Sequence, residues 1–165
     1  NTIQMQTSWA RTSDPRFGGD PSAHLFFGAI PMFHVAGLIA VMGQAIADRR
    51  ERVLLMTKVC THGRGARVAM RQLEESLRRL KTDYLDIAQL HSCSWEILRQ
   101  GDPIEGLQRA VEKGYTRYIG YSGDNEHART AIDLDVFDSL QISVSFLDQS
   151  PIDGNIPLAA EKAWG

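Results

Sequence analysis

The sequence is poor in cysteine: its 165 residues include only Cys60 and Cys93. Two cysteines build neither a disulfide framework nor a set of metal ligands. Disulfides are rare in the reducing cytosol, whereas small secreted domains are rich in them. We therefore predict two reduced thiols, no metal site and a cytoplasmic protein.

Long apolar runs and an excess of one charge are also missing. The longest apolar stretch, residues 35–47, is broken by Gly37, Gly43 and Gln44 and falls short of the roughly 18–20 residues that span a bilayer. The N-terminus lacks the basic-then-apolar layout of a secretory signal. With 18 basic and 20 acidic residues, the net charge is −2, which creates no positive field for nucleic acid. We expect neither membrane nor nucleic acid as a partner.

What the sequence does contain is typical of a folded domain. Hydrophobic residues make up 43% of the chain, with 6 Phe, 4 Tyr and 3 Trp, so there is enough apolar surface to bury a core. The first residue is Asn1 rather than methionine. We expect a processed chain or a fragment of a longer protein.

Short apolar runs alternate with stretches of helical period. The predicted strands cover residues 25–30, 53–57, 84–90, 117–121 and 140–146. The marker residues Gly28, Lys58, His91 and Ser122 are 30, 33 and 31 positions apart, about the length of one strand plus a crossover helix. Strands joined in this way run parallel. The pattern predicts an α/β fold with a parallel sheet and five to six βα units.

Apolar spacing predicts helices between these strands, at residues 36–47, 66–80, from Asp102 to about 113, and 126–134. We predict Asp102 as a helix N-cap, followed by Pro103 in the first turn, and Trp95 in a loop. Residues 1–24 do not follow the alternation and are predicted as an irregular segment ahead of one domain, residues 25–165.

Four polar residues fall near strand ends: Lys58, His91, Ser122 and Gln141, the last of these near the start of its predicted strand. In parallel α/β folds the chemistry lies at the carboxyl ends of strands. Taken alone, Lys58 is typical of a solvated strand end and His91 of a hydrogen-bonded structural histidine. Their equivalent positions, one βα unit apart, favour a shared site.

Three segments are more specific: residues 44–58 (QAIADRRERVLLMTK), 73–91 (LEESLRRLKTDYLDIAQLH) and 113–125 (KGYTRYIGYSGDN). They resemble the aldo-keto reductase superfamily, and the similarity runs from about residue 25 to 165. The resemblance implies a (β/α)8 TIM barrel, an NADPH cofactor and reduction of a small-molecule aldehyde or ketone. It also implies Lys58 and His91 as catalytic residues and Ser122 and Gln141 as contacts of the nicotinamide carboxamide.

Two residues of the family's active site are missing. The motif F-F-D-T-A-x-x-Y-G is matched by the segment that begins at Phe26, so that its aspartate becomes Gly28 and its tyrosine Phe33. Phe33 has no proton to donate, and Gly28 cannot pair Lys58. A partly buried lysine without a carboxylate partner should have a lowered pKa or pair with another group. His34 is an alternative proton donor.

The cofactor contacts depart from the family's pattern as well. Gly123 replaces the asparagine that usually follows Ser122, and Asp124 and Asn125 are the candidates to replace that contact.

Length limits what the resemblance implies. A barrel of this kind needs about 250 residues, so we expect the last two strands to be missing, NADPH binding to be weak and the open sheet edges to self-associate. The prediction is an aldo-keto reductase-type oxidoreductase impaired by the loss of Asp and Tyr. The alternative is a non-catalytic binding or regulatory protein on the same scaffold. A flavodoxin-like domain is disfavoured because no glycine-rich phosphate loop follows the first strand.

Overall fold

The computed structural model describes residues 25–28, 50–60, 65–162 and 164. Its centre is a five-stranded sheet in the order β1-β2-β3-β4-β5, with every neighbouring pair parallel. The strands are β1 (Leu25–Gly28), β2 (Val53–Val59), β3 (Leu85–His91), β4 (Thr116–Ser122) and β5 (Ser139–Gln141). Sequential order and parallel pairing confirm the predicted run of βα units. The outer strands of this sheet are β1 and β5, and self-association through them stays a prediction.

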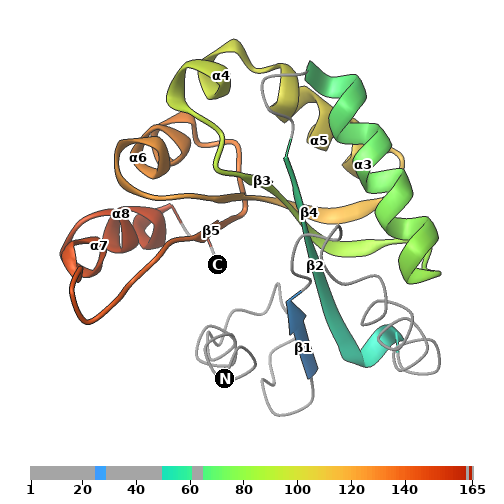
Figure 1. The fold of residues 1–165 in the computed structure, drawn as a ribbon, viewed down its shortest axis with the longest axis horizontal. Helices are drawn as coiled ribbons and strands as arrows, with labels where there is room; N and C mark the ends of the chain where they lie inside the picture. Colours follow the sequence, from blue (N-terminus) through green and yellow to red (C-terminus); the bar gives the residue numbers. More distant parts are fainter. Residues whose placement is uncertain (1–24, 29–49, 61–64, 163, 165) are drawn as a thin grey trace.

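Helices follow the strands around the outside of the sheet (Figure 1). They are the 3₁₀ turn η3 (Arg50–Arg52), α3 (Gly65–Leu80), α4 (Trp95–Gln100), α5 (Asp102–Glu112), α6 (Asn125–Leu134), α7 (Ser150–Asp153) and α8 (Asn155–Glu161). Within the described ranges, none of these helices is long and apolar enough to cross a membrane.

Two local predictions were wrong around residue 100. Trp95 begins helix α4 rather than lying in a loop. Gly101, with φ of 84°, ends α4 and is also the N-cap of α5, so that Asp102 is the first helical residue and not the cap. A left-handed backbone is least strained at glycine, and one glycine therefore separates two helices that the apolar spacing does not resolve.

The fifth strand is shorter than predicted: it ends at Gln141 instead of running to residue 146. The backbone N–H of Ser143 donates to the Asp124 carboxylate at 2.7 Å rather than to a neighbouring strand. Beyond it, Phe146 is 92% exposed. The alternating pattern was a poor guide here because side chain–backbone bonds compete with a strand ladder. The predicted helix at 36–47 and the segment 1–24 lie outside the described residues.

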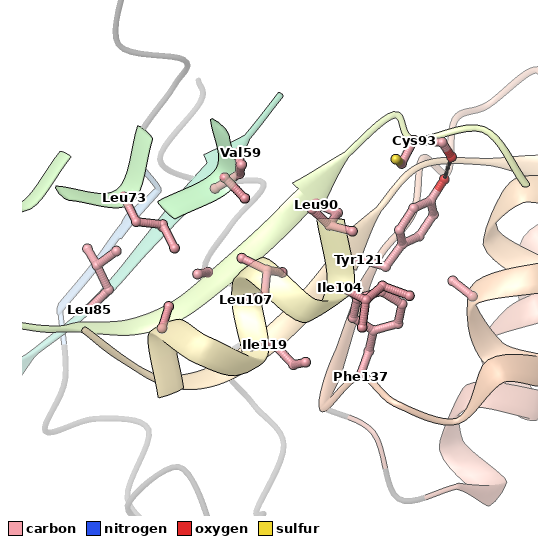
Figure 2. Packing of buried hydrophobic residues seen from close by; sticks show 14 of the residues in the cluster. Val59, Leu73, Leu85, Leu90, Cys93, Ile104, Leu107, Ile119, Tyr121 and Phe137 are labelled. Carbon is pink, nitrogen blue, oxygen red and sulfur yellow. Dashed lines mark hydrogen bonds between the residues drawn. The ribbon is translucent and has the colours of Figure 1, made fainter. Parts of the chain in front are cut away.

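The core lies between the sheet and the helices. Residues paired across four strands, Val59, Leu90, Tyr121 and Leu140, all point to this side and are buried. Figure 2 shows Leu73 of α3 near Val59 and Leu107 of α5 near Leu90, within the same buried cluster. The Tyr121 hydroxyl donates to the Cys93 carbonyl at 2.6 Å, and burial raises the pKa of this phenol above its usual range.

A buried charge cluster lies on the same side of the sheet, near the start of β3. The Asp86 side chain is 2% exposed and accepts a hydrogen bond from the Leu55 N–H at 2.8 Å. It forms ion pairs with Arg50 at 2.8 Å and Arg117 at 3.1 Å. Arg50 also donates to the Tyr84 carbonyl at 2.9 Å. One carboxylate therefore links η3, β2, β3 and β4.

Candidate functional site

The other face of the sheet carries the residues singled out by the sequence. Because side chains alternate along a strand, the positions between the core residues point away from the helices. Two neighbouring rows result: Lys58, Gln89, Gly120 and Ser139 in one, and His91, Ser122 and Gln141 in the next. The fold thus brings all four candidate residues to one face, at the carboxyl ends of consecutive strands.

Lys58 reaches across the sheet. Its Nζ donates to the Ser122 Oγ at 2.9 Å, and because β3 separates β2 from β4, the side chain must pass over β3. Burial lowers the pKa of Lys58, while the charges of Cys60 and Asp124 oppose that shift. The expectation that Lys58 would lower its pKa or find another partner is met in both respects.

His91 lies beside this lysine. Burial lowers its pKa, and the positive charge of Lys58 lowers it further. Its Nδ1 is buried and has no hydrogen-bond partner. The neutral imidazole is therefore the favoured form at neutral pH, and a neutral imidazole can donate one hydrogen bond to an oxygen placed above it.

Removing the lysine charge tests this coupling. We expect Lys58→Met to raise the pKa of His91, because a like charge is lost while the burial remains. Lys58→Arg, which keeps the charge, is the control. The pKa of His91 in the folded state lies below the ordinary 6.5, so the unfolded chain binds the proton first. The fold therefore loses stability as the pH falls from about 6.5 toward the folded pKa. NMR titration of the imidazole measures the change; equal pKa values in the two variants would contradict the coupling.

Ser122 and Gln141 are paired across β4 and β5. Gln141 is the last residue of β5, a correction to its predicted place near the start of that strand, and this places it level with Ser122. The Gly123 N–H donates to the Gln141 carbonyl at 3.1 Å. The Gln141 Oε1 is buried and has no partner, while the Ser122 hydroxyl, which accepts from Lys58, keeps its own proton to donate. The pair offers one donor and one acceptor, the complement of a carboxamide.

The position of the missing aspartate lies at the end of β1. Gly28, the last residue of β1, pairs with Met56, two residues before Lys58, and so falls on the face that carries Lys58. No carboxylate extends from that position. Among the described residues, no carboxylate forms an ion pair with Lys58. Phe33 lies outside the described residues.

Sequence reasoning missed a second polar pair on this face. Gln89 and Ser139 are fully buried, and their side-chain N and O atoms have no hydrogen-bond partner. They lie over Gly120, where an added Cβ would be 2.3 Å from the Ser139 Oγ and 3.0 Å from the Gln89 Cγ. The available signal was the period of two, which places Gln89 on the same face as His91.

Comparison with known proteins agrees with this geometry. Residues 39–162 match the Aldo/keto reductase family. Methylglyoxal reductase YeaE of Escherichia coli (strain K12) is 34% identical over 94 residues, 55% of this chain and 31% of the relative. An aldo-keto reductase of Mycobacterium avium (strain 104) is 36% identical over 90 residues, 53% of this chain and 32% of the relative.

Solved structures are similar as well. The aldo/keto reductase from Klebsiella pneumoniae in complex with NADP and acetate superposes with a TM-score of 0.67 and 28% identity, covering 81% of this chain and 48% of that one. The holo form of aldo-keto reductase AKR11C1 from Bacillus halodurans gives 0.68 and 27%, covering 77% and 44%. The chain therefore spans about a third of these curated relatives and about half of these structures.

Proposed function

This chain belongs to the aldo/keto reductase family, and we propose that its function is NADPH-dependent reduction of a small carbonyl compound, impaired by the residues at positions 28 and 33. The observation that carries the proposal is the joint placement of Lys58, His91, Ser122 and Gln141 on one face, at the carboxyl ends of the strands.

Each of these residues has a role that its environment supports. Ser122 and Gln141 fit a nicotinamide carboxamide, because one hydroxyl proton and one buried, unpartnered oxygen are available there. Bound NADPH would supply the hydride. His91 would orient the substrate carbonyl by a hydrogen bond, and the Lys58 ammonium would stabilise negative charge on its oxygen.

The impairment follows from the two replacements. Reduction of a carbonyl needs a proton on the oxygen, and the phenyl ring of Phe33 has none to give. Gly28 supplies no carboxylate to pair Lys58. The same two replacements favour a second candidate function: a binding or regulatory protein that retains the scaffold without catalysis.

Cofactor binding is the first test. We expect NADPH to quench the tryptophan fluorescence of the 165-residue chain. Gln141→Ala should weaken the apparent affinity by about 10-fold, the value of one hydrogen bond. Gln149→Ala, a change of the same type at an exposed residue of the following segment, should leave the affinity unaltered. Absence of quenching, or equal effects of both variants, would contradict a nicotinamide site at Gln141.

A probe substrate follows from the relatives. The relative from Escherichia coli is named a methylglyoxal reductase, and we propose methylglyoxal as the first carbonyl compound to assay. We expect the unaltered chain to oxidise NADPH in its presence slowly or not at all, because the proton donor is missing. Efficient turnover would show that another residue, such as His34, supplies the proton.

A further inference from the structure

Asp124 lies at the rim of the site, two residues beyond Ser122. It occupies the N-cap position of α6, yet its side chain makes no capping hydrogen bond to that helix. Both carboxylate oxygens are used elsewhere: Oδ1 accepts from the Ser143 N–H at 2.7 Å and Oδ2 from the Ser143 hydroxyl at 3.1 Å. The carboxylate therefore ties the β4–α6 loop to the segment that follows β5.

This tie acts on the position of Gln141. The Gly123 N–H holds the Gln141 carbonyl, and Asp124 holds Ser143 two residues later. Gly123 and Asp124, which are consecutive in the β4–α6 loop, thus form hydrogen bonds with the last residue of β5 and with the second residue after it. The Gln141 carboxamide is presented to the site from this end of β5.

Asp124 also bears on the charge of Lys58. Two groups with negative charge raise the pKa of Lys58: Cys60, directly after β2, and Asp124, after β4. His91 on β3 also faces this ammonium, which lowers the pKa of the imidazole. The direct hydrogen-bond partner of Lys58, the Ser122 hydroxyl, is neutral. Of the carboxylates in the described part of the chain, Asp124 is the one whose negative charge raises the pKa of Lys58 against the effect of burial.

We propose that Asp124 is a positioning residue of this site, which balances the charge of Lys58 where β1 ends in glycine and holds Gln141 in place through Ser143. The consequence for cofactor binding rests on the proposed function. The effects on Lys58 and on Ser143 do not, because they concern this chain's own residues.

Two variants separate the charge from the tie. Asp124→Asn removes the negative charge but keeps an oxygen that accepts from the Ser143 N–H, whereas Asp124→Ala removes both. We expect each variant to reduce the proton affinity of Lys58 by about 3- to 10-fold, because a neighbouring negative charge in a partly solvated environment is lost. NMR titration of the ¹³C-labelled lysine side chain measures this. Asp133→Asn, an equal charge change on α6, is the control and should have no effect. An unchanged Lys58 in Asp124→Asn would overturn the charge role.

Hydrogen exchange at the Ser143 amide measures the tie. We expect faster exchange in Asp124→Ala than in Asp124→Asn, because only the alanine variant leaves that N–H without its acceptor. Equal exchange in the unaltered chain and Asp124→Ala would overturn the positioning role.

NADPH titration of the same variants connects the inference to the proposed function. We expect Asp124→Ala to weaken NADPH binding by about 10-fold and Asp124→Asn by less. If the unaltered chain does not bind NADPH, the proposed function fails, while the Lys58 and Ser143 measurements still decide the inference. If NADPH binds equally well to the unaltered chain and to Asp124→Ala, Asp124 does not position the site.

Discussion

Introducing aspartate at position 28 and tyrosine at position 33 together should raise the rate of NADPH-dependent carbonyl reduction by about 10²- to 10⁴-fold, the usual contribution of a positioned general acid. The tyrosine would supply the missing proton. The Lys58 ammonium would favour the phenolate form and so bring the pKa of that tyrosine closer to neutrality. The new carboxylate would lie on the face that carries Lys58, since Gly28 pairs with Met56. The rate is measured by the loss of NADPH absorbance with methylglyoxal as the substrate.

The two single variants show which of the two residues restores the rate of carbonyl reduction. Phe33→Tyr alone should recover part of the rate, whereas Gly28→Asp alone should recover none, because a carboxylate beside Lys58 still leaves no phenol to donate. Adding Lys58→Met to the double variant should abolish the gain. If the double variant binds NADPH and still reduces no carbonyl compound, the non-catalytic reading of this scaffold is the correct one.

Replacing Asp86 by alanine should lower the free energy of unfolding by about 3–5 kcal/mol, the cost of removing one partner from a buried ionic cluster. The change leaves the Leu55 N–H without its acceptor and Arg50, only 13% exposed, without its counter-charge. Denaturant unfolding provides the measurement, as a fall in the midpoint at constant slope.

Controls for this prediction come from the same chain. Asp133→Ala removes a carboxylate that pairs with Arg129 on the exposed side of α6, and should change the free energy of unfolding by no more than about 0.5 kcal/mol. Arg117→Ala should cost less than Asp86→Ala, because Arg117 is 58% exposed. If Asp86→Ala is as mild as Asp133→Ala, the cluster does not stabilise the fold.

The order and direction of the helices and strands follow from local sequence patterns. Apolar runs such as residues 53–57, alternating with helical spacing such as residues 66–80, predict parallel βα units, and the structure confirms them as β2 and α3. Parallel strands place their carboxyl ends at one edge. The strand pattern alone therefore assigns Lys58, His91 and Ser122 to one edge of the sheet.

Which side chains contact one another depends on long-range packing. The bond from Lys58 to Ser122 joins residues 64 positions apart, and that from Ser143 to Asp124 spans 19. The second of these, with the end of β5 at Gln141, replaces a strand that local pattern extends to residue 146. Periodicity reports which face a residue occupies. Strand register and loop hydrogen bonds determine its partner, because they depend on residues distant in the chain that no local pattern encodes.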